Sequence, residues 1–157
     1  MTKYLLDTNI PLYLEDPGSP FHNCVKKSFQ KLQDEDQLFV SVLSLYELHY
    51  GVALKKKEAG EQLAAQTLLV IEEIKKQFEI LPLSGKEAST FGEIKALYKV
   101  RAKKKDKNQV TIKKHDVDFI LAAAAIEYGL VIISNDGIFS KIKESFPKLK
   151  VENWAKV

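Results

Sequence analysis

The sequence is poor in the features that crosslink, export or anchor a chain. It holds a single cysteine, Cys24, among 157 residues, which excludes an internal disulfide framework and suits a reducing compartment. Its first ten residues, MTKYLLDTNI, have neither the apolar core nor the cleavage site of a signal peptide. The longest strongly apolar run, FILAAAAI, is far shorter than the roughly 20 residues that span a bilayer. We therefore expect a cytoplasmic protein with no membrane partner.

Several catalytic signatures are absent as well. The three histidines, His22, His49 and His115, do not stand at metal-ligand spacing, and no glycine-rich phosphate loop occurs. The composition, 45% hydrophobic and 29% charged, is that of a globular protein. The length suits one ordinary domain, and no linker divides it, so residues 1–157 are expected to form a single domain.

Basic residues are concentrated in one segment. Residues 95–114 hold nine of the 24 Lys and Arg residues but only one of the 21 Asp and Glu residues. The rest of the chain is therefore net negative. A basic segment on an otherwise acidic domain favours an anionic partner, with nucleic acid the first candidate. A solvated lysine loop is the alternative.

Apolar periodicity alternates between strand-like and helix-like along the chain. We expect strands over residues 3–6, 38–42, 78–83 and 130–134, with an edge strand at 148–153. Helices are expected from Pro11, over 21–32, 44–57, 61–78, 84–101 and 116–128, and after Asp136. This alternation predicts a parallel sheet, in which ligands bind beyond the carboxyl ends of the strands.

Four acidic residues fall near those strand ends. Asp7 follows the first strand, Glu47 lies early in the helix after the second, Asp118 begins the last long helix, and Asp136 follows the last central strand. Each has a local alternative: Asp7 and Asp136 as caps or turn residues, Glu47 in a capping box with Ser44, and Asp118 as a favourable charge at a helix N-terminus.

Together, four such carboxylates would repel one another unless a cation neutralised them. An all-oxygen set suits Mg²⁺ or Mn²⁺, and a cation held this way supplies the chemistry of phosphodiester hydrolysis without a serine nucleophile or a histidine base. Other α/β phosphate enzymes fit less well. The stretch LLDTNI lacks the second aspartate of haloacid-type phosphatases, and no acidic pair typical of receiver domains precedes it.

Three stretches carry a resemblance to a known family: YLLDTNI (4–10), SVLSLYELHYGV (41–52) and DFILAAAAIEYGLVIISND (118–136). They resemble the PIN-domain ribonucleases, most closely the VapC-type toxins of toxin–antitoxin pairs, over nearly the whole chain. The resemblance implies a PIN-like three-layer α/β/α sandwich with a central, mainly parallel sheet of four to five strands. It also implies that Asp7, Glu47, Asp118 and Asp136 are the catalytic and metal-binding acids.

The resemblance gives neighbouring polar residues a supporting role: Thr8, Asn9, Asn135 and Ser134, where the family usually has threonine. Asp116 lies two residues before Asp118 and is a possible alternative acid, although the register of DFILAAAA favours Asp118. Tyr46, Tyr50 and Trp154 are interpreted as packing residues rather than as platforms for RNA bases.

The resemblance further implies an RNA substrate, with tRNA or ribosomal RNA favoured, a homodimer, and a small VapB-like antitoxin. An acidic pocket does not attract RNA by itself, so we expect a basic rim to bind it; its candidates are Lys103, Lys104, Lys105, Lys107, Lys113 and Lys114. The basic segment is longer than the turn common in such toxins. Two alternatives stay open: a non-catalytic RNA-binding PIN-like domain, and an RNA-processing nuclease without a toxin role.

Overall fold

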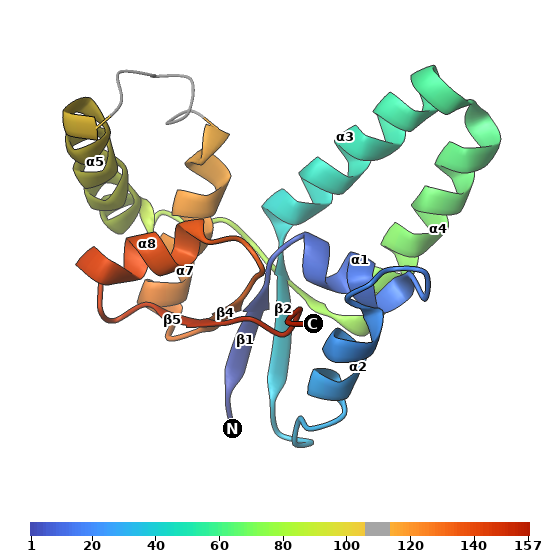
Figure 1. The fold of residues 1–157 in the computed structure, drawn as a ribbon, viewed down its shortest axis with the longest axis horizontal. Helices are drawn as coiled ribbons and strands as arrows, with labels where there is room; N and C mark the ends of the chain where they lie inside the picture. The colour runs from blue at the N-terminus through green and yellow to red at the C-terminus, as the bar shows by residue number, and fades with distance from the viewer. Residues whose placement is uncertain (106–113) are drawn as a thin grey trace.

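A five-stranded parallel sheet organises the protein in this computed structural model, which describes residues 1–105 and 114–157 (Figure 1). The strands are β1 (Lys3–Leu6), β2 (Gln37–Ser41), β3 (Glu79–Leu81), β4 (Val131–Ile133) and β5 (Lys150–Glu152). Their order in space is β3-β2-β1-β4-β5, and each neighbouring pair is parallel. The expected parallel sheet is confirmed, with β5 as an edge strand.

Helices cover both faces of this sheet. They are α1 (Asn9–Glu15), α2 (His22–Phe29), α3 (Val42–Ala59), α4 (Glu61–Gln77), α5 (Ala88–Lys105), α7 (Asp116–Tyr128) and α8 (Ile138–Ser145). Helices α5, α7 and α8 pack on one face, and α1, α2 and α4 pack on the other. The three-layer α/β/α sandwich is therefore confirmed. Among the helices described, none is long and apolar enough to cross a membrane.

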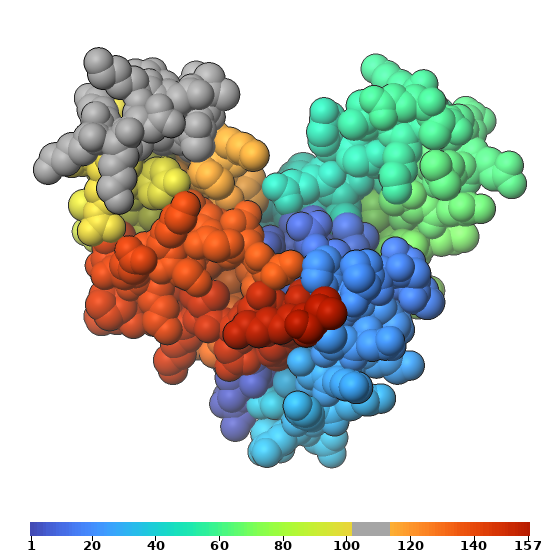
Figure 2. Space-filling model, in the orientation of Figure 1, coloured from blue at the N-terminus to red at the C-terminus, as the bar shows by residue number. Residues whose placement is uncertain are grey.

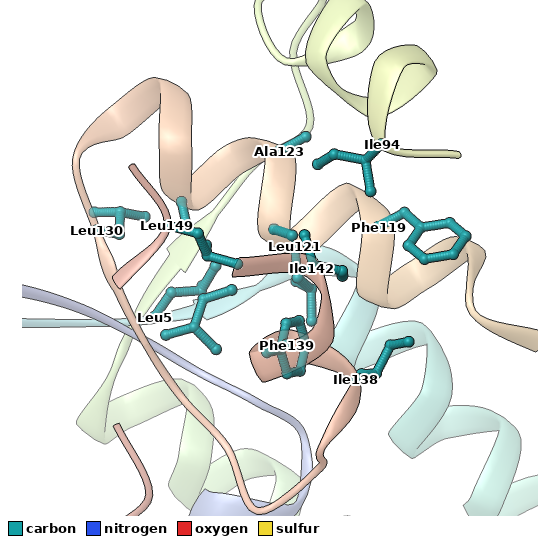
Figure 3. Close-up of a cluster of buried hydrophobic side chains, with 13 residues drawn as sticks. Leu5, Ile94, Phe119, Leu121, Ala123, Leu130, Ile138, Phe139, Ile142 and Leu149 are labelled. Carbon is teal, nitrogen blue, oxygen red and sulfur yellow. The ribbon is translucent and has the colours of Figure 1, made fainter. Parts of the chain in front are cut away.

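The sheet separates two hydrophobic clusters because successive side chains of a strand point to opposite faces. Leu5 and Ile132, which are partners across β1 and β4, belong to the first cluster; the next pair, Leu6 and Ile133, belongs to the second. Figure 3 shows the first cluster, in which Leu5 of the sheet lies together with side chains of α5, α7 and α8. Burial on both faces explains why these strands read as continuous apolar runs rather than alternating ones.

Helix α7 is built to approach the sheet closely. Its four alanines, Ala122–Ala125, are all buried, so the small-residue stretch serves core packing as the sequence indicates. The helix ends where Gly129 adopts a left-handed conformation with φ of 65°, which glycine adopts without the strain that a side chain would cause. This packing fixes the position of the first turn of α7, which carries Asp116 and Asp118.

Helix α3 begins earlier than the sequence suggests. It starts at Val42, because the Ser41 side chain caps it by accepting a 3.2 Å hydrogen bond from the Leu43 N–H. The capping box of Ser44 and Glu47 is therefore wrong: Ser44 is already inside the first turn and fully buried. The Glu47 carboxylate is not engaged at the helix start and is available for contacts across the site.

The order of the strands creates a switch point between β1 and β4. From β1 the chain adds β2 and β3 on one side, then crosses back to add β4 and β5 on the other. Ligands of open parallel sheets bind at such a point, beyond the carboxyl ends of the strands, because the two connections leave in opposite directions. Asp7 follows β1 directly, and Ser134, Asn135 and Asp136 follow β4.

Candidate active site

Asp7 is fixed from both strands that flank the switch point. Its backbone N–H continues the sheet by donating to the carbonyl oxygen of Ile133 at 3.0 Å. Its carboxylate accepts a 2.8 Å bond from the Thr8 N–H and a 2.7 Å bond from the Ser134 hydroxyl. Asp7 is therefore more than a local cap, since one of its partners lies 127 positions away in the sequence.

Glu47 reaches the same edge of the sheet from α3. The Thr8 hydroxyl donates to Glu47 Oε2 at 2.6 Å and lies 2.9 Å from the buried Ser44 hydroxyl. A hydroxyl has one proton to donate and two lone pairs to accept with, so Thr8 can hold Glu47 and accept from Ser44 together. Ser44 was not predicted from the sequence to belong to this chain of contacts, because its position suggested a helix cap.

Asp118 and Asp116 face different neighbours, which separates the two candidates for the third acid. Asp118 Oδ2 lies 2.9 Å from Nδ1 of His115, and both side chains are mostly buried. Asp116 is instead bound by Lys95 of α5, whose Nζ lies 3.0 Å from Asp116 Oδ2. His115 was also missed as a neighbour of the site, although its spacing of three residues from Asp118 places both on one side of a helical turn.

Asp136 combines a local and a shared role. Its Oδ1 accepts a 3.0 Å bond from the Ile138 N–H, so it does support the start of α8 as its local alternative supposed. Its own N–H donates to the Ser134 hydroxyl at 2.9 Å. One serine hydroxyl therefore joins the backbone of Asp136 to the carboxylate of Asp7.

Asn9 and Asn135, the other polar residues expected to support the site, are exposed at its edge. Asn9 is exposed at the first position of α1. Asn135 is exposed as well, and its Oδ1 accepts a 2.8 Å bond from the Asn153 side chain beyond β5. Neither side chain is held against the acids by a hydrogen bond that the structure records.

The charges of the acids affect the pKa values of Asp7 and Asp118. Burial raises the pKa of Asp7 above its ordinary value of 3.8; the hydrogen bonds from Ser134 and Thr8 oppose the rise, and the charges of Glu47 and Asp136 add to it. Burial also raises the pKa of Asp118, opposed by the His115 hydrogen bond and increased by the charges of Asp7 and Asp136. Carboxylates from β1, α3, α7 and the end of β4 thus act on one another.

The acids do not yet form a closed metal cage. Among the described residues, no three His, Cys, Asp or Glu side chains converge closely enough to hold a metal ion directly. Each carboxylate has a hydrogen-bond partner of its own instead. The donors are nevertheless all carboxylate oxygens, and two of the four, those of Asp7 and Asp118, are partly buried. That set fits a hard divalent cation such as Mg²⁺, which commonly keeps several waters and takes one or two carboxylates.

The surface of the molecule is hollowed above this edge of the sheet. Figure 2 shows a wide notch between the lobe formed by α3 and α4 and the side of the molecule formed by α7 and α8, with the start of α1 at its floor. Of the lysines expected to form a basic rim, Lys114 is exposed just before α7. Lys103, Lys104 and Lys105 lie in the last turn of α5, and Lys107 and Lys113 lie outside the described residues.

Comparison with known proteins assigns the chain and its fold to a family. The sequence pattern of the PIN domain matches residues 4–145. The protein named Ribonuclease VapC2 of Haemophilus influenzae is 31% identical over 154 residues, which is 98% of this chain and 99% of that protein. A protein of the same name from Rickettsia felis is 27% identical over 157 residues, with 98% of both chains covered.

Solved structures share the fold. A chain of the VapBC2 complex of Rickettsia felis bound to a promoter DNA fragment superposes with a TM-score of 0.70 and 24% identity, covering 98% of this chain and 99% of that one. A chain of VapBC-1 from nontypeable Haemophilus influenzae gives 0.68 and 20%, covering 99% and 100%. With the extent of the family match and the identity to the first relative, the chain belongs to the PIN-domain family, alongside its VapC ribonucleases.

Proposed function

We propose that this protein is a metal-dependent endoribonuclease that hydrolyses phosphodiester bonds in RNA and acts as the toxin of a VapBC-type toxin–antitoxin pair. One observation carries the proposal: four carboxylates lie around the switch point of the sheet, where the charges of Glu47 and Asp136 add to the raised pKa of Asp7, and those of Asp7 and Asp136 add to the raised pKa of Asp118. A cluster of charges that is costly to assemble in the absence of a cation points to a function for the cation. The two relatives named ribonucleases support RNA as the substrate.

Asp7, Glu47, Asp118 and Asp136 are the residues we propose to hold the metal, some of them through water. Mg²⁺ is the proposed ion, with Mn²⁺ able to substitute. When bound, such a cation lowers the pKa of a water ligand and neutralises charge on the phosphoryl and leaving oxygens. Thr8 and Ser134 position Glu47 and Asp7 by the hydrogen bonds described above, and we propose Asn9 and Asn135 as further polar groups at the rim.

Substrate attraction must come from outside the acidic cluster. We propose that the basic segment before α7 binds the RNA backbone, with Lys103, Lys104, Lys105, Lys107, Lys113 and Lys114 as contacts. Each phosphate neutralised by such a lysine releases a counterion, so affinity should fall steeply with salt, with a slope of about −0.7 per contact for a single strand. A nearly flat salt dependence between low and moderate ionic strength would contradict the basic rim.

The protein partners that we propose are based on the complexes in which the similar solved chains occur. The similar solved chains belong to complexes named VapBC, so we propose a small VapB-like antitoxin for this protein, together with a homodimer and a cytoplasmic location. We also propose that residues 1–157 act as one PIN-like nuclease domain, with tRNA or ribosomal RNA as the target. Growth arrest on expression, relieved by co-expression of a small protein encoded beside this one, would distinguish a toxin from an RNA-processing nuclease.

The deciding experiment is cleavage of total cellular RNA by the purified protein with Mg²⁺ or Mn²⁺. We expect discrete products that disappear with EDTA and in Asp7→Asn, Asp118→Asn and Asp136→Asn variants. Asp34→Asn is the matched control, because Asp34 is an exposed aspartate that follows α2, away from the four acids. If the wild type and these variants bind RNA equally and none cuts it, the protein is an RNA-binding PIN-like domain instead.

A further inference from the structure

The outer face of α3 carries two exposed tyrosines that the core does not use. Tyr46 and Tyr50 each keep 69% of their surface exposed, whereas Ser44 and Leu48 on the inner face of the same helix are buried. The interpretation of these tyrosines as packing residues is therefore wrong, although it is correct for Trp154, which is 9% exposed. Two large rings in solvent on one helix need another explanation.

Their position relative to Glu47 is fixed by helical geometry. Tyr46 and Tyr50 are four residues apart and share one face, and Glu47 and Tyr50 are three apart and adjacent. Side chains of an α-helix lean toward its N-terminus. The N-terminus of α3 follows β2 at the edge of the sheet where Asp7 and Thr8 lie. The two rings therefore lie next to Glu47, one of the acids proposed to hold the metal, on a helix of the lobe that borders the notch.

We propose that Tyr46 and Tyr50 form a platform on which unpaired bases of an RNA strand stack next to the phosphate to be cut. Exposed aromatic rings bind bases of any sequence because every base presents a π-face. The inference rests on the proposed ribonuclease function and deepens it. It selects single-stranded RNA or loops, because bases inside a duplex are not free to stack on a side chain.

A positive charge on the face of α3 that carries the two tyrosines supports a nucleic acid as the ligand of the platform. Lys57 lies eleven residues after Tyr46, which is close to three full turns, so it continues the stripe of the two tyrosines toward the tip of the α3–α4 hairpin. It is exposed. Aromatic rings in line with a cation are the combination by which proteins hold a single strand, the rings taking bases and the cation a phosphate.

The size of the apolar area argues against a second copy of the chain as the occupant. Two rings at this exposure offer on the order of 300 Å², whereas a stable protein interface buries about 800 Å² on each partner. The stripe is narrow as well, since His49 and Glu47, which flank it on the helix, are polar and exposed. A narrow aromatic stripe ending in a cation fits a strand better than a protein face.

The test compares variants that keep the ring with variants that lose it. Tyr46→Phe and Tyr50→Phe keep stacking, whereas Tyr46→Leu and Tyr50→Leu keep bulk and lose it. Leu69→Ala, at a side chain of α4 that is 68% exposed, is the control for general loss of surface apolarity. Binding is measured in an Asp7→Asn background, to prevent cleavage, with a short single-stranded RNA whose 2-aminopurine fluorescence reports stacking.

We expect each leucine variant to bind the RNA about tenfold more weakly and to lose the fluorescence quench, with the phenylalanine variants and Leu69→Ala unchanged. In the cleavage-competent protein the leucine variants should raise KM and leave kcat nearly unaltered. Equal affinities for leucine and phenylalanine variants would overturn the platform. So would a leucine variant that binds RNA normally but dissociates a dimer in sedimentation, because the face would then be a protein interface.

The two proposals fail in different ways. If the wild-type protein quenches the probe through these tyrosines but cuts no RNA with Mg²⁺ or Mn²⁺, the nuclease function fails and the platform stands as a binding site. If the wild type cuts RNA and the leucine variants cut it with the same KM, the nuclease stands and the platform fails.

Discussion

The Ser134 hydroxyl donates a 2.7 Å hydrogen bond to Oδ2 of Asp7, and Oγ of Ser134 accepts a 2.9 Å hydrogen bond from the Asp136 N–H. Ser134 is buried, with 3% of its surface exposed, so water does not readily replace it in either bond. One hydroxyl group thereby sets the orientation of one acid and the backbone of another, across the gap between β1 and β4.

Ser134→Ala is expected to lower cleavage activity although all four acids are kept. The variant leaves the Asp7 carboxylate without a donor that lowers its pKa, so the acid limb of the pH–rate profile should move to higher pH. Loss of such a supporting bond typically lowers activity about 10- to 100-fold, and unfolding should become easier by about 1–2 kcal/mol. Ser134→Thr keeps the hydroxyl and should keep the profile; if alanine and threonine variants have the same profile, the bond does not position Asp7.

Thr8→Val removes the hydroxyl that holds Glu47 and preserves the shape of the side chain. We expect about tenfold slower cleavage, since the 2.6 Å bond to Glu47 Oε2 is lost. Thr8→Ser should restore most of the rate. Steady-state cleavage of a fluorescent RNA measures the effect, and equal rates in all three proteins would show that Glu47 needs no positioning.

Asp7→Asn is expected to stabilise the metal-free protein while abolishing cleavage. Burial raises the pKa of Asp7 above its ordinary value of 3.8. Between pH 3.8 and this raised pKa, the folded state therefore binds more protons than the unfolded state. The contribution of Asp7 to the free energy of unfolding therefore falls as pH rises through this window, and above it the charged group is a net cost. Asparagine removes this cost, so Tm of the variant at pH 7 should exceed that of the wild type.

Thermal unfolding in EDTA across acid to neutral pH checks this expectation. Addition of Mg²⁺ should raise Tm of the wild type, because a ligand that binds only the folded state stabilises it, and should raise Tm of Asp7→Asn less. If Asp7→Asn has a lower Tm than the wild type at neutral pH, and Mg²⁺ changes Tm of neither protein, the acids do not form a binding site for the cation.

Replacement by asparagine should greatly reduce the cleavage rate at Asp118 and change it little at Asp116. Asp118→Asn is expected to reduce cleavage by about 100-fold or more, because Asp118 shares the electrostatic field of Asp7 and Asp136. Asp116→Asn should leave the rate within a few-fold, and so should Lys95→Met, because both change only the pair between α5 and α7. Loss of cleavage in Asp116→Asn with activity in Asp118→Asn would exchange the two assignments.

The sequence could predict the sheet and the place of the acids because both depend on strong local patterns. Apolar runs ending at Asp7 and Asp136 predict strands, and a parallel sheet then brings their carboxyl ends to one edge. The helix of small residues over 116–128 was predicted with its observed bounds, since Gly129 marks its end clearly.

What the sequence could not predict are the contacts between side chains from distant elements. The start of α3 was misplaced because Ser41 and Ser44 are both acceptable caps, and only the position of β2 decides between them. The pairing of Asp116 with Lys95 depends on how α5 packs against α7. The exposure of Tyr46 and Tyr50 likewise follows from which face of α3 packs against α4, and local periodicity is weak there.

The strand order also governs when the site first exists during synthesis. Because β4 lies next to β1 but is made after β2 and β3, a growing chain that stops before residue 131 has an open edge where Ser134 and Asp136 belong. Domains generally fold as units during synthesis. We therefore expect a chain that is still being synthesised, or that is truncated before residue 131, to lack the assembled site.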